Sequence, residues 1–348
     1  MKVWMALAGL GGCGTDTTAQ TTDSGDAPAT SGDTGAAPSA YRWEPIAVDG
    51  VPPVWGAIGA GPWLTGGLDA TLTVRPEVWS ATGGDPVQGA ETGALETARF
   101  CGCALADEGR GELVVLGGRD DGYNETATTE RVDVATGVAT AVDAGGADDH
   151  PVGCAAFFSP AHDRGWVFGG VGGMTFSSET YRYDPAARTF ELLAAEGPSA
   201  RYDPGVVTLP DGDGLVIGGM GAAGFDAEVW RFDADTETWS AVPSPSTRVP
   251  DGRRFPWVAL SDDAEVVVYG YGTNSSMGAT TMRDLWAFEL ATGEWTRIDP
   301  EGPRPTARAF TAWLPGPTGS LGVLAFGVDE AMASQTDAWV LWGPEAGR

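Results

Sequence analysis

The 348-residue sequence predicts an all-β fold made of six similar units. Five hydrophobic runs end in a glycine-centred break, and a fainter copy of the same run, ending at Gly66, precedes them. The first glycines fall at positions 66, 117, 169, 218, 270 and 327, so successive breaks are 51, 52, 49, 52 and 57 residues apart. A nearly fixed period of this length indicates one supersecondary unit used repeatedly.

Each unit contains the pattern of four strands. An acidic residue opens an alternation of aromatic side chains after the break, and another aromatic residue follows eleven positions after the acid, as in Glu179–Phe190, Glu228–Trp239 and Asp284–Trp295. Period-two alternation predicts strands, and Asp184-Pro185 is a turn between two of them. We therefore expect one strand before each glycine-terminated run, the run itself, and two strands after it.

These features together resemble the kelch family over residues 41–348. The resemblance rests on the Gly-Gly pair, the acid before the aromatic strand, and the Trp or Phe eleven residues after that acid. Two breaks depart from the family pattern, because Gly270 and Gly327 lack the second glycine. The resemblance implies that the chain forms a six-bladed kelch-type β-propeller, a ring whose blade edges are short and protected.

The two ends of the domain predict how the ring closes. The last unit, residues 337–342, stops at a Gly-Pro pair and lacks an outer strand. Residues 41–46 read like the outer strand of the unit before it, at residues 294–298. We expect this N-terminal strand to complete the last blade, because pairing the first and last segments covers an edge that could otherwise aggregate.

The first forty residues have the pattern of a bacterial export signal followed by a tether. Residues 1–12 hold a short apolar stretch and two glycines before Cys13, a pattern similar to a lipoprotein signal peptide. The alternative is a chance cysteine in an ordinary signal peptide. After lipidation at Cys13, residues 13–40, which have no aromatic or basic residue, would form a disordered linker. The sequence thus predicts an exported lipoprotein anchored to a bacterial cell membrane, on the periplasmic or surface face of the outer membrane.

Charge excludes several classes of partner and chemistry. The formal net charge is −28, and Lys2, inside the predicted signal, is the only lysine. Nucleic acids and anionic lipid surfaces bind basic proteins, so we expect no nucleic acid partner and membrane contact through the lipid anchor only. Without a lysine in the mature chain, Schiff-base chemistry and a P-loop are excluded.

Three cysteines lie in the predicted propeller. Cys103 lies 14 residues before its glycine pair and Cys154 lies 15 before its own, so both fall on the innermost strands of neighbouring blades. Cys101 lies two residues from Cys103 and shares its strand face. An exported protein permits a disulfide between Cys154 and either Cys101 or Cys103, and Cys103–Cys154 is our candidate pair. The alternative is that all three are small buried hydrophobic residues.

No cofactor or metal site is expected. Copper radical oxidases carry kelch propellers, but their chemistry needs two histidine ligands, and His150 and His162 belong at opposite ends of one blade. The Asp-rich turns at 120–122 and 211–213 do not match an EF-hand calcium loop. Neither histidine has a candidate serine and acid placed around it for a Ser-His-Asp set.

Two columns of charged residues recur with the blades. Arginines stand at the start of the first strand, and acids at the start of the third, which lies on the same face of the ring. The arginines are Arg99, Arg201, Arg253 or Arg254, and Arg308; the acids are Glu77, Glu130, Glu179, Glu228, Asp284 and Asp337. One interpretation is structural, with Arg–carboxylate pairs between blades. The other is a pocket at the mouth of the central channel, lined by Arg99, Arg201, Arg254 and Arg308, for a carboxylate or phosphate.

The loops after the glycine breaks lie on this same face and differ most between blades. They carry isolated large side chains, namely Tyr123, Phe225 and Tyr271. Loops on a rigid scaffold commonly hold binding residues, although small-residue loops can equally be simple connections. We expect these three residues to be part of a ligand-binding face.

Three functions are compatible with this sequence. The first is a membrane-tethered, non-catalytic scaffold that binds a protein or glycan through its loop-rich face. The second is an enzyme similar to periplasmic kelch proteins that isomerise or mutarotate a sugar, with an acid/base carboxylate in an Arg-lined central pocket. The third is a purely architectural surface protein. Fold alone does not choose among them, and the lack of a recognisable catalytic set favours a non-enzyme.

Overall fold

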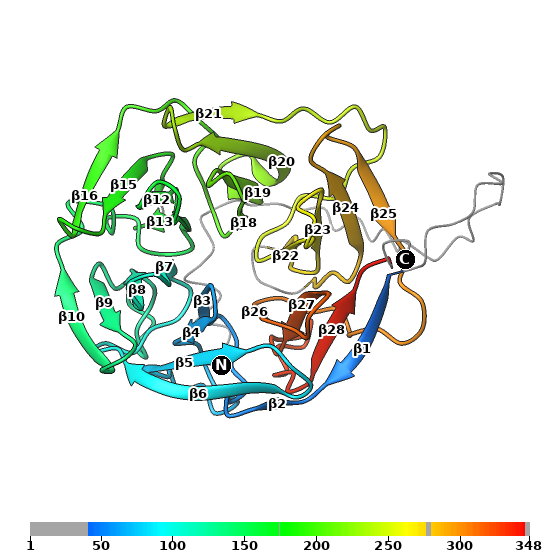
Figure 1. Cartoon of the computed structure of the whole chain (residues 1–348), viewed down its shortest axis with the longest axis horizontal. Coiled ribbons are helices and arrows are strands. Elements are labelled where there is room, and N and C mark those ends of the chain that lie inside the picture. The colour runs from blue at the N-terminus through cyan, green and yellow to red at the C-terminus, as the bar shows by residue number, and fades with distance from the viewer. Residues whose placement is uncertain (1–40, 174, 276–279, 345–348) are drawn as a thin grey trace, which may run out of the picture.

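The computed structural model describes residues 41–173, 175–275 and 280–344, which form a six-bladed β-propeller (Figure 1). These described residues contain strands and no helix, and hence no helix long and apolar enough to cross a bilayer. The predicted signal peptide (1–12), the lipidation site Cys13 and the linker (13–40) lie outside the described residues.

Each blade is built on a four-stranded antiparallel sheet, and in blades 1 to 5 the strands follow chain order from the axis to the rim, as the sequence pattern predicts (Figure 1). Blade 1 consists of β3 (Ile58–Ala60), β4 (Trp63–Thr65), β5 (Glu77–Thr82) and β6 (Val87–Ala94). Blade 2 consists of β7 (Cys103–Asp107), β8 (Glu112–Leu116), β9 (Thr129–Asp133) and β10 (Val138–Val142). Blade 3 consists of β11 (Ala155–Ser159), β12 (Arg164–Phe168), β15 (Thr180–Asp184) and β16 (Thr189–Leu193), with a small hairpin of β13 (Val171–Gly172) and β14 (Thr175–Phe176).

The second half of the ring repeats this arrangement. Blade 4 consists of β18 (Gly205–Thr208), β19 (Gly214–Gly221), β20 (Gly224–Asp233) and β21 (Thr238–Ala241), and β17 (Arg201–Tyr202) extends its inner edge. Blade 5 consists of β22 (Trp257–Leu260), β23 (Val266–Gly270), β24 (Leu285–Glu289) and β25 (Trp295–Ile298). Blade 6 takes β26 (Ala312–Leu314), β27 (Ser320–Ala325) and β28 (Ala338–Trp342) from the C-terminal part of the chain.

The outer strand of blade 6 comes from the other end of the domain. β1 (Arg42–Ile46) pairs antiparallel with β28, with Trp43 opposite Leu341 and Ile46 opposite Ala338. The chain then continues into β2 (Val48–Asp49), which pairs parallel with β6 of blade 1. The first ten described residues therefore contact both the last blade and the first, which lie side by side in Figure 1.

The second strand of every blade ends in two consecutive residues with positive φ. Four blades use Gly-Gly there, at 66–67, 117–118, 169–170 and 218–219. Blade 5 uses Tyr271 (φ 56°) with Gly272 (φ 84°), and blade 6 uses Phe326 (φ 61°) with Gly327 (φ 94°). Our interpretation that Gly270 and Gly327 had lost their second glycine is wrong, because it is the first glycine that an aromatic residue replaces.

The second residue of this pair explains why the repeat keeps glycine there. In blades 1 to 5 its N–H donates to a carbonyl at the entrance of the next blade, as in Gly118 to Pro151 (2.7 Å) and Gly272 to Arg308 (3.0 Å). A Cβ added to Gly170 would lie 2.3 Å from the carbonyl oxygen of His150, which is too close for any side chain. The glycine period in the sequence therefore marks the positions where neighbouring blades are joined through their backbones.

The core lies between the faces of neighbouring blades. Blades 2 and 3 share one such cluster, with Leu105 and Val114 packed against Val167 and Tyr183. A disulfide joins Cys103 to Cys154 across this interface, with a Cα–Cα distance of 5.5 Å, while Cys101 is a buried free thiol. Apolar burial of this kind is the main favourable contribution to folding.

Candidate functional site

The arginines of the column connect the first strand of a blade to its third strand, and we call them braces. Arg99, Arg201, Arg253 and Arg308 are each at most 1% exposed. Each donates from Nε to the carbonyl two residues earlier and from Nη1 to the first residue of the positive-φ pair in its own blade. Each also forms an ion pair with the acid at the start of the third strand, namely Glu130, Glu228, Asp284 and Asp337.

This geometry revises both interpretations of the arginine column. The Arg–carboxylate pairs lie within a blade, between its first and third strands, and not between blades as we expected. Because these guanidinium groups are buried and already donate to protein acceptors, Arg99, Arg201 and Arg308 present no donor to a ligand. The structural interpretation therefore accounts for three of the four proposed ligand-binding arginines. Blade 3 uses His150 in the same position, 3.9 Å from Glu179.

Arg254 is not one of the braces, because its side chain lies at the propeller axis. Arg253 fills the brace position of blade 5, so the sequence ambiguity between the two arginines is resolved. Arg254 is 1% exposed and lies between aromatic rings, 4.7 Å from the ring centre of Tyr202 and 4.6 Å from that of Phe255. Its Nη1 also donates to the hydroxyl of Tyr202. A guanidinium held this way gains cation–π attraction in addition to its ion pair.

A run of backbone hydrogen bonds from Phe310 to Phe255 passes around the axis beside Arg254. One residue from each blade takes a left-handed conformation there, with φ between 52° and 68°: Gly56, Cys101, Gly153, Asp203, Phe255 and Phe310. Five backbone hydrogen bonds of 2.6–3.1 Å connect these six residues around the axis. Only two of them are glycine, although each left-handed residue with a Cβ costs about 1–2 kcal/mol. The axis is therefore built from strained positions that carry side chains.

These side chains and their neighbours form what we call the axial cluster. Aromatic contacts run from Phe255 to Phe310 (4.0 Å between ring centres), to Trp55 (5.6 Å), to Phe100 (6.3 Å) and to Tyr123 (5.7 Å). On the other side of Arg254, Tyr202 packs on Phe176 at 5.6 Å. Trp55, Phe100, Tyr202 and Phe310 are buried, whereas Tyr123, Phe176 and Phe255 are half-buried. The cluster thus has a closed base and a partly exposed upper layer on the loop-bearing face.

One carboxylate lies in the base of the axial cluster. The side chain of Asp203 is 1% exposed, and Nε of Arg254 lies 3.2 Å from its Oδ2. Within the described residues, neither carboxylate oxygen has a hydrogen-bond partner. Desolvation by burial raises the pKa of Asp203 to about 7, and the guanidinium groups of Arg254 and Arg119 oppose this rise. Desolvation also raises the pKa of the neighbouring Cys101 thiol, which keeps it protonated and unreactive.

The three proposed aromatic binding residues have three different placements. Tyr123 belongs to the upper layer of the axial cluster. Phe225 is half-buried on the hairpin between β19 and β20, opposite Met220. Tyr271 is 0% exposed and packs edge-on against Trp43, at 5.8 Å between ring centres. Tyr271 is therefore a core residue of the blade 5–blade 6 interface, and our expectation that it faces a ligand is wrong.

Sequence reasoning missed two partners of Tyr123 on the upper layer. Leu72 and Met332 are half-buried and pack against the same cluster from blades 1 and 6. A repeated signal could have identified them, because each of the three residues is the fourth in a five-residue loop that begins with aspartate. These loops are residues 69–73, 120–124 and 329–333.

The structure also brings a serine and an acid to His162, which we did not expect. Ser159 Oγ lies 2.8 Å from Nδ1 of His162, and Asp235 Oδ1 from blade 4 lies 3.1 Å from Nε2. In a hydrolytic triad the serine is accessible to substrate and the acid is buried. Here the opposite holds, because Ser159 is fully buried and the side chain of Asp235 is 88% exposed. The set therefore links blades 3 and 4 and offers no accessible nucleophile.

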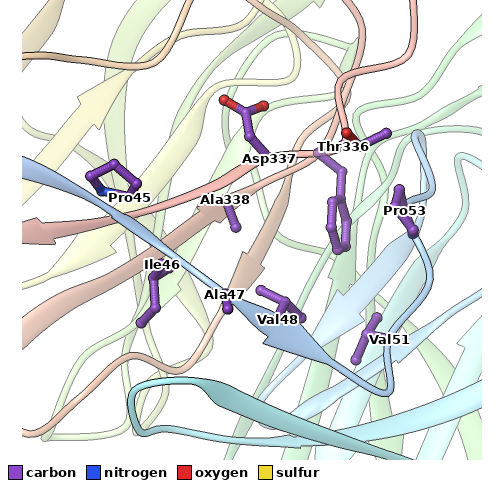
Figure 2. A pocket seen from close by; sticks show the side chains of 10 residues that line it. Pro45, Ile46, Ala47, Val48, Val51, Pro53, Thr336, Asp337 and Ala338 are labelled. Atoms are coloured by element: carbon purple, nitrogen blue, oxygen red, sulfur yellow. The ribbon is translucent and has the colours of Figure 1, made fainter.

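A cavity of about 400 Å³ lies where blade 6 meets blade 1. Figure 2 shows Thr336 and Asp337 on one side of it and the segment from Pro45 to Pro53 on the other. Its lining is mainly apolar, and the carboxylate of Asp337 already accepts hydrogen bonds from Arg308 and from the indole of Trp339. Nothing in the sequence pattern predicts this cavity, which arises from the crossing between β1 and β2.

Comparison with known families agrees with this architecture. Residues 97–314, more than half of the chain, match the model of the KLHDC2/KLHL20/DRC7 Kelch-repeats domain. No curated protein gives a significant match. Propellers of this kind commonly serve as scaffolds for protein interactions. The repeated glycine pairs, the six four-stranded blades and this match together show that the chain belongs to the kelch-repeat family of β-propellers.

Proposed function

We propose that this propeller is a non-catalytic scaffold that binds a protein partner through its loop-bearing face, over the axial cluster. The observation that supports it best is the upper layer of that cluster. Leu72, Tyr123 and Met332 have φ values of 63°, 63° and 59°, although none of them is glycine. Strained positions of this kind persist where the surrounding structure holds them, and they concentrate at ligand-binding sites.

Aliphatic side chains on this face favour a protein partner over a glycan. Glycans commonly stack on flat aromatic rings, whereas Leu72 and Met332 are flexible and non-planar. Methionine is over-used at surfaces that bind partners by hydrophobic contact, because its unbranched side chain adapts to their shape. A glycan partner would need Tyr123 and Phe225 as its main contacts, so it is a distinguishable outcome of the tests below.

One observation supports the enzyme alternative, and another argues against it. A carboxylate with a raised pKa beside an arginine, as found for Asp203 and Arg254, is a feature that catalytic sites share. However, the side chain of Asp203 is 1% exposed under the aromatic residues of the axial cluster. A sugar could not contact this carboxylate without displacing them, so we favour a binding role.

The proposal includes a tether to a membrane through lipid on Cys13. The support is the sequence pattern of residues 1–40 alone. It predicts that the full chain incorporates a clickable palmitate analogue when expressed in a bacterium and partitions with membranes. A Cys13→Ser variant should lose the label and become soluble. Labelling of the variant as strong as that of the parent chain would contradict lipidation at this residue.

Site-specific photo-crosslinking tests the binding proposal directly. A photoreactive phenylalanine analogue would be placed at Tyr123 or Met332 of the full chain, and at Val138 or Leu192 as controls. The control residues are 54% and 52% exposed on the outer strands β10 and β16. We expect a discrete protein adduct only from the axial positions. Adducts of equal yield from all four positions, or from the outer strands alone, would contradict the proposal.

A further inference from the structure

Three neighbouring blades carry loops of the same construction. In blades 6, 1 and 2, the loops 329–333, 69–73 and 120–124 each close through a backbone hydrogen bond from the aspartate N–H to the carbonyl of the fifth residue. A second bond runs from the N–H of the fourth residue to the aspartate carbonyl. In all three, the aspartate carboxylate accepts the N–H of the fifth residue, at 2.9–3.1 Å.

This construction determines which side chains face a partner. The aspartate carboxylates turn inward to the loop backbone, and the fourth residue is forced into the left-handed region, where glycine or asparagine is the ordinary choice. The sequence instead places Leu72, Tyr123 and Met332 there, and all three pack against the axial cluster. The three loops together, which we call the three-loop surface, therefore present an apolar group from each blade.

The charged residues within these loops are all acidic. The fifteen residues of the three loops include five acids and no lysine or arginine. Asp121 and Glu330 are exposed at the second position of their loops. Two arginines contact the loops, Arg75 at 3.8 Å from the carboxylate of Asp69 and Arg119 through a hydrogen bond to the carbonyl of Tyr123 (3.0 Å). Both are also paired with a glutamate outside the loops, Arg75 with Glu77 (2.7 Å) and Arg119 with Glu125 (3.1 Å). The formal net charge of −28 adds to the same negative field.

We infer that the three-loop surface binds a partner segment in which an apolar side chain is flanked by lysine or arginine. The inference rests on the proposed function and adds the chemistry of the partner. The apolar side chain would contact Leu72, Tyr123 and Met332, and the flanking cations would lie beside Asp121 and Glu330. Complementary charge across an interface gives specificity and faster association, and a central apolar contact supplies most of the affinity.

A peptide selection tests this inference and does not require the natural partner to be identified first. A displayed library of random twelve-residue peptides would be selected on the full chain in 150 mM salt, which screens weak long-range attraction to the acidic protein. Winning peptides would be synthesised together with two derivatives, one with cations replaced by glutamate and one with apolar residues replaced by serine. Affinity would be measured by fluorescence polarisation.

Four variants identify where the peptides bind. Tyr123→Ser/Met332→Ser removes apolar contacts of the three-loop surface, and its control is Val138→Ser/Leu192→Ser. Asp121→Asn/Glu330→Gln removes two negative charges, and Asp262→Asn/Glu294→Gln removes two exposed charges in blade 5 turns on the other face. We expect cationic, apolar peptides to lose at least about tenfold in affinity with each axial variant, about 1.4 kcal/mol, and to keep it with both controls.

The outcomes separate this inference from the proposed function. Neutral or acidic peptides that depend on Tyr123 and Met332 would overturn the inference about charge and leave the docking face in place. Peptides that bind every variant equally well would overturn both. Peptides that depend on Tyr123 alone, with no effect of Met332→Ser by itself, would also overturn the inference, because it requires loops from more than one blade.

Discussion

The guanidinium group of Arg253 donates two hydrogen bonds to the carboxylate of Asp284, with lengths of 2.6 and 2.8 Å. The arginine is fully buried and the side chain of Asp284 is 21% exposed. Burial disfavours the charged carboxylate, but the hydrogen bonds and charge of Arg253, with the indole N–H of Trp286, keep the pKa of Asp284 below its usual value. Equivalent pairs in blades 2, 4 and 6 connect the first strand of the blade to the third.

This arrangement predicts that Arg253 and Arg254 have different roles despite being adjacent. Arg253→Ala should lower the free energy of unfolding by about 3 kcal/mol, because it leaves a partly buried carboxylate without its cation, with the Trp286 indole as its side-chain donor, and removes the donor to two backbone carbonyls. Urea unfolding monitored by tryptophan fluorescence would measure this. The exposed Arg283→Ala is the control and should change stability by less than about 0.5 kcal/mol. Equal effects of the two substitutions would show that the braces contribute nothing.

Asp203 predicts an unusual dependence of stability on pH. Its pKa in the folded protein is about 7, whereas an unfolded aspartate titrates near about 3.9. Between these values the folded protein holds a proton that the unfolded chain has released. Its stabilising contribution is therefore complete below pH 4 and is lost as pH rises through 7, with a slope of at most about 1.4 kcal/mol per pH unit.

Asp203→Asn is the corresponding test, because asparagine keeps the shape and cannot ionise. The variant should lose this slope between pH 5 and 7 and should be more stable than the parent chain at pH 8. The exposed Asp262→Asn should keep the parent slope. If Asp203→Asn is less stable than the parent at pH 8, then the ion pair with Arg254 outweighs the cost of burying the charge.

Because of the disulfide, we expect the stability of the propeller to fall under reducing conditions. Cys103 and Cys154 are separated by 51 residues and join blades 2 and 3. Constraining a loop of this length in the unfolded chain typically adds about 2–4 kcal/mol. Cys103→Ser/Cys154→Ser, or reduction before unfolding, should therefore lower stability by that order. Cys101→Ser keeps the disulfide and should respond to reductant as the parent chain does, whereas Cys103→Ser/Cys154→Ser should not respond. A parent chain whose urea midpoint is unchanged by reductant would contradict the pairing.

We expect the Ser159–His162–Asp235 set to stabilise the contact between blades 3 and 4 and to have no hydrolytic activity. A fluorophosphonate probe should leave Ser159 unlabelled in the folded protein, because its side chain is fully buried. His162→Ala should lower the free energy of unfolding by about 1 kcal/mol, through loss of hydrogen bonds between blades 3 and 4. Labelling of Ser159 that disappears in His162→Ala would show instead that the set is a working nucleophile.

Much of the fold was predictable because the repeat fixes it locally. The glycine period and the aromatic alternation set the strands, and β1 pairs with β28 where residues 41–46 resemble an outer strand. The different roles of Arg253 and Arg254 were not predictable from the sequence. The two side chains are identical, and what distinguishes Arg253 is its ion pair with Asp284, which is 31 residues away in the chain. The axial cluster was hidden for a related reason: Cys101, Asp203, Phe255 and Phe310 occupy left-handed positions that a sequence pattern assigns to glycine.

Hydrogen–deuterium exchange of the full chain, with and without the crosslinked partner, tests the central claim most directly. The account predicts slower amide exchange in residues 69–73, 120–124 and 329–333 when the partner is bound, and no change in β10 and β16 on the rim. Protection confined to those outer strands, with all three loops exchanging as in the free protein, would contradict it.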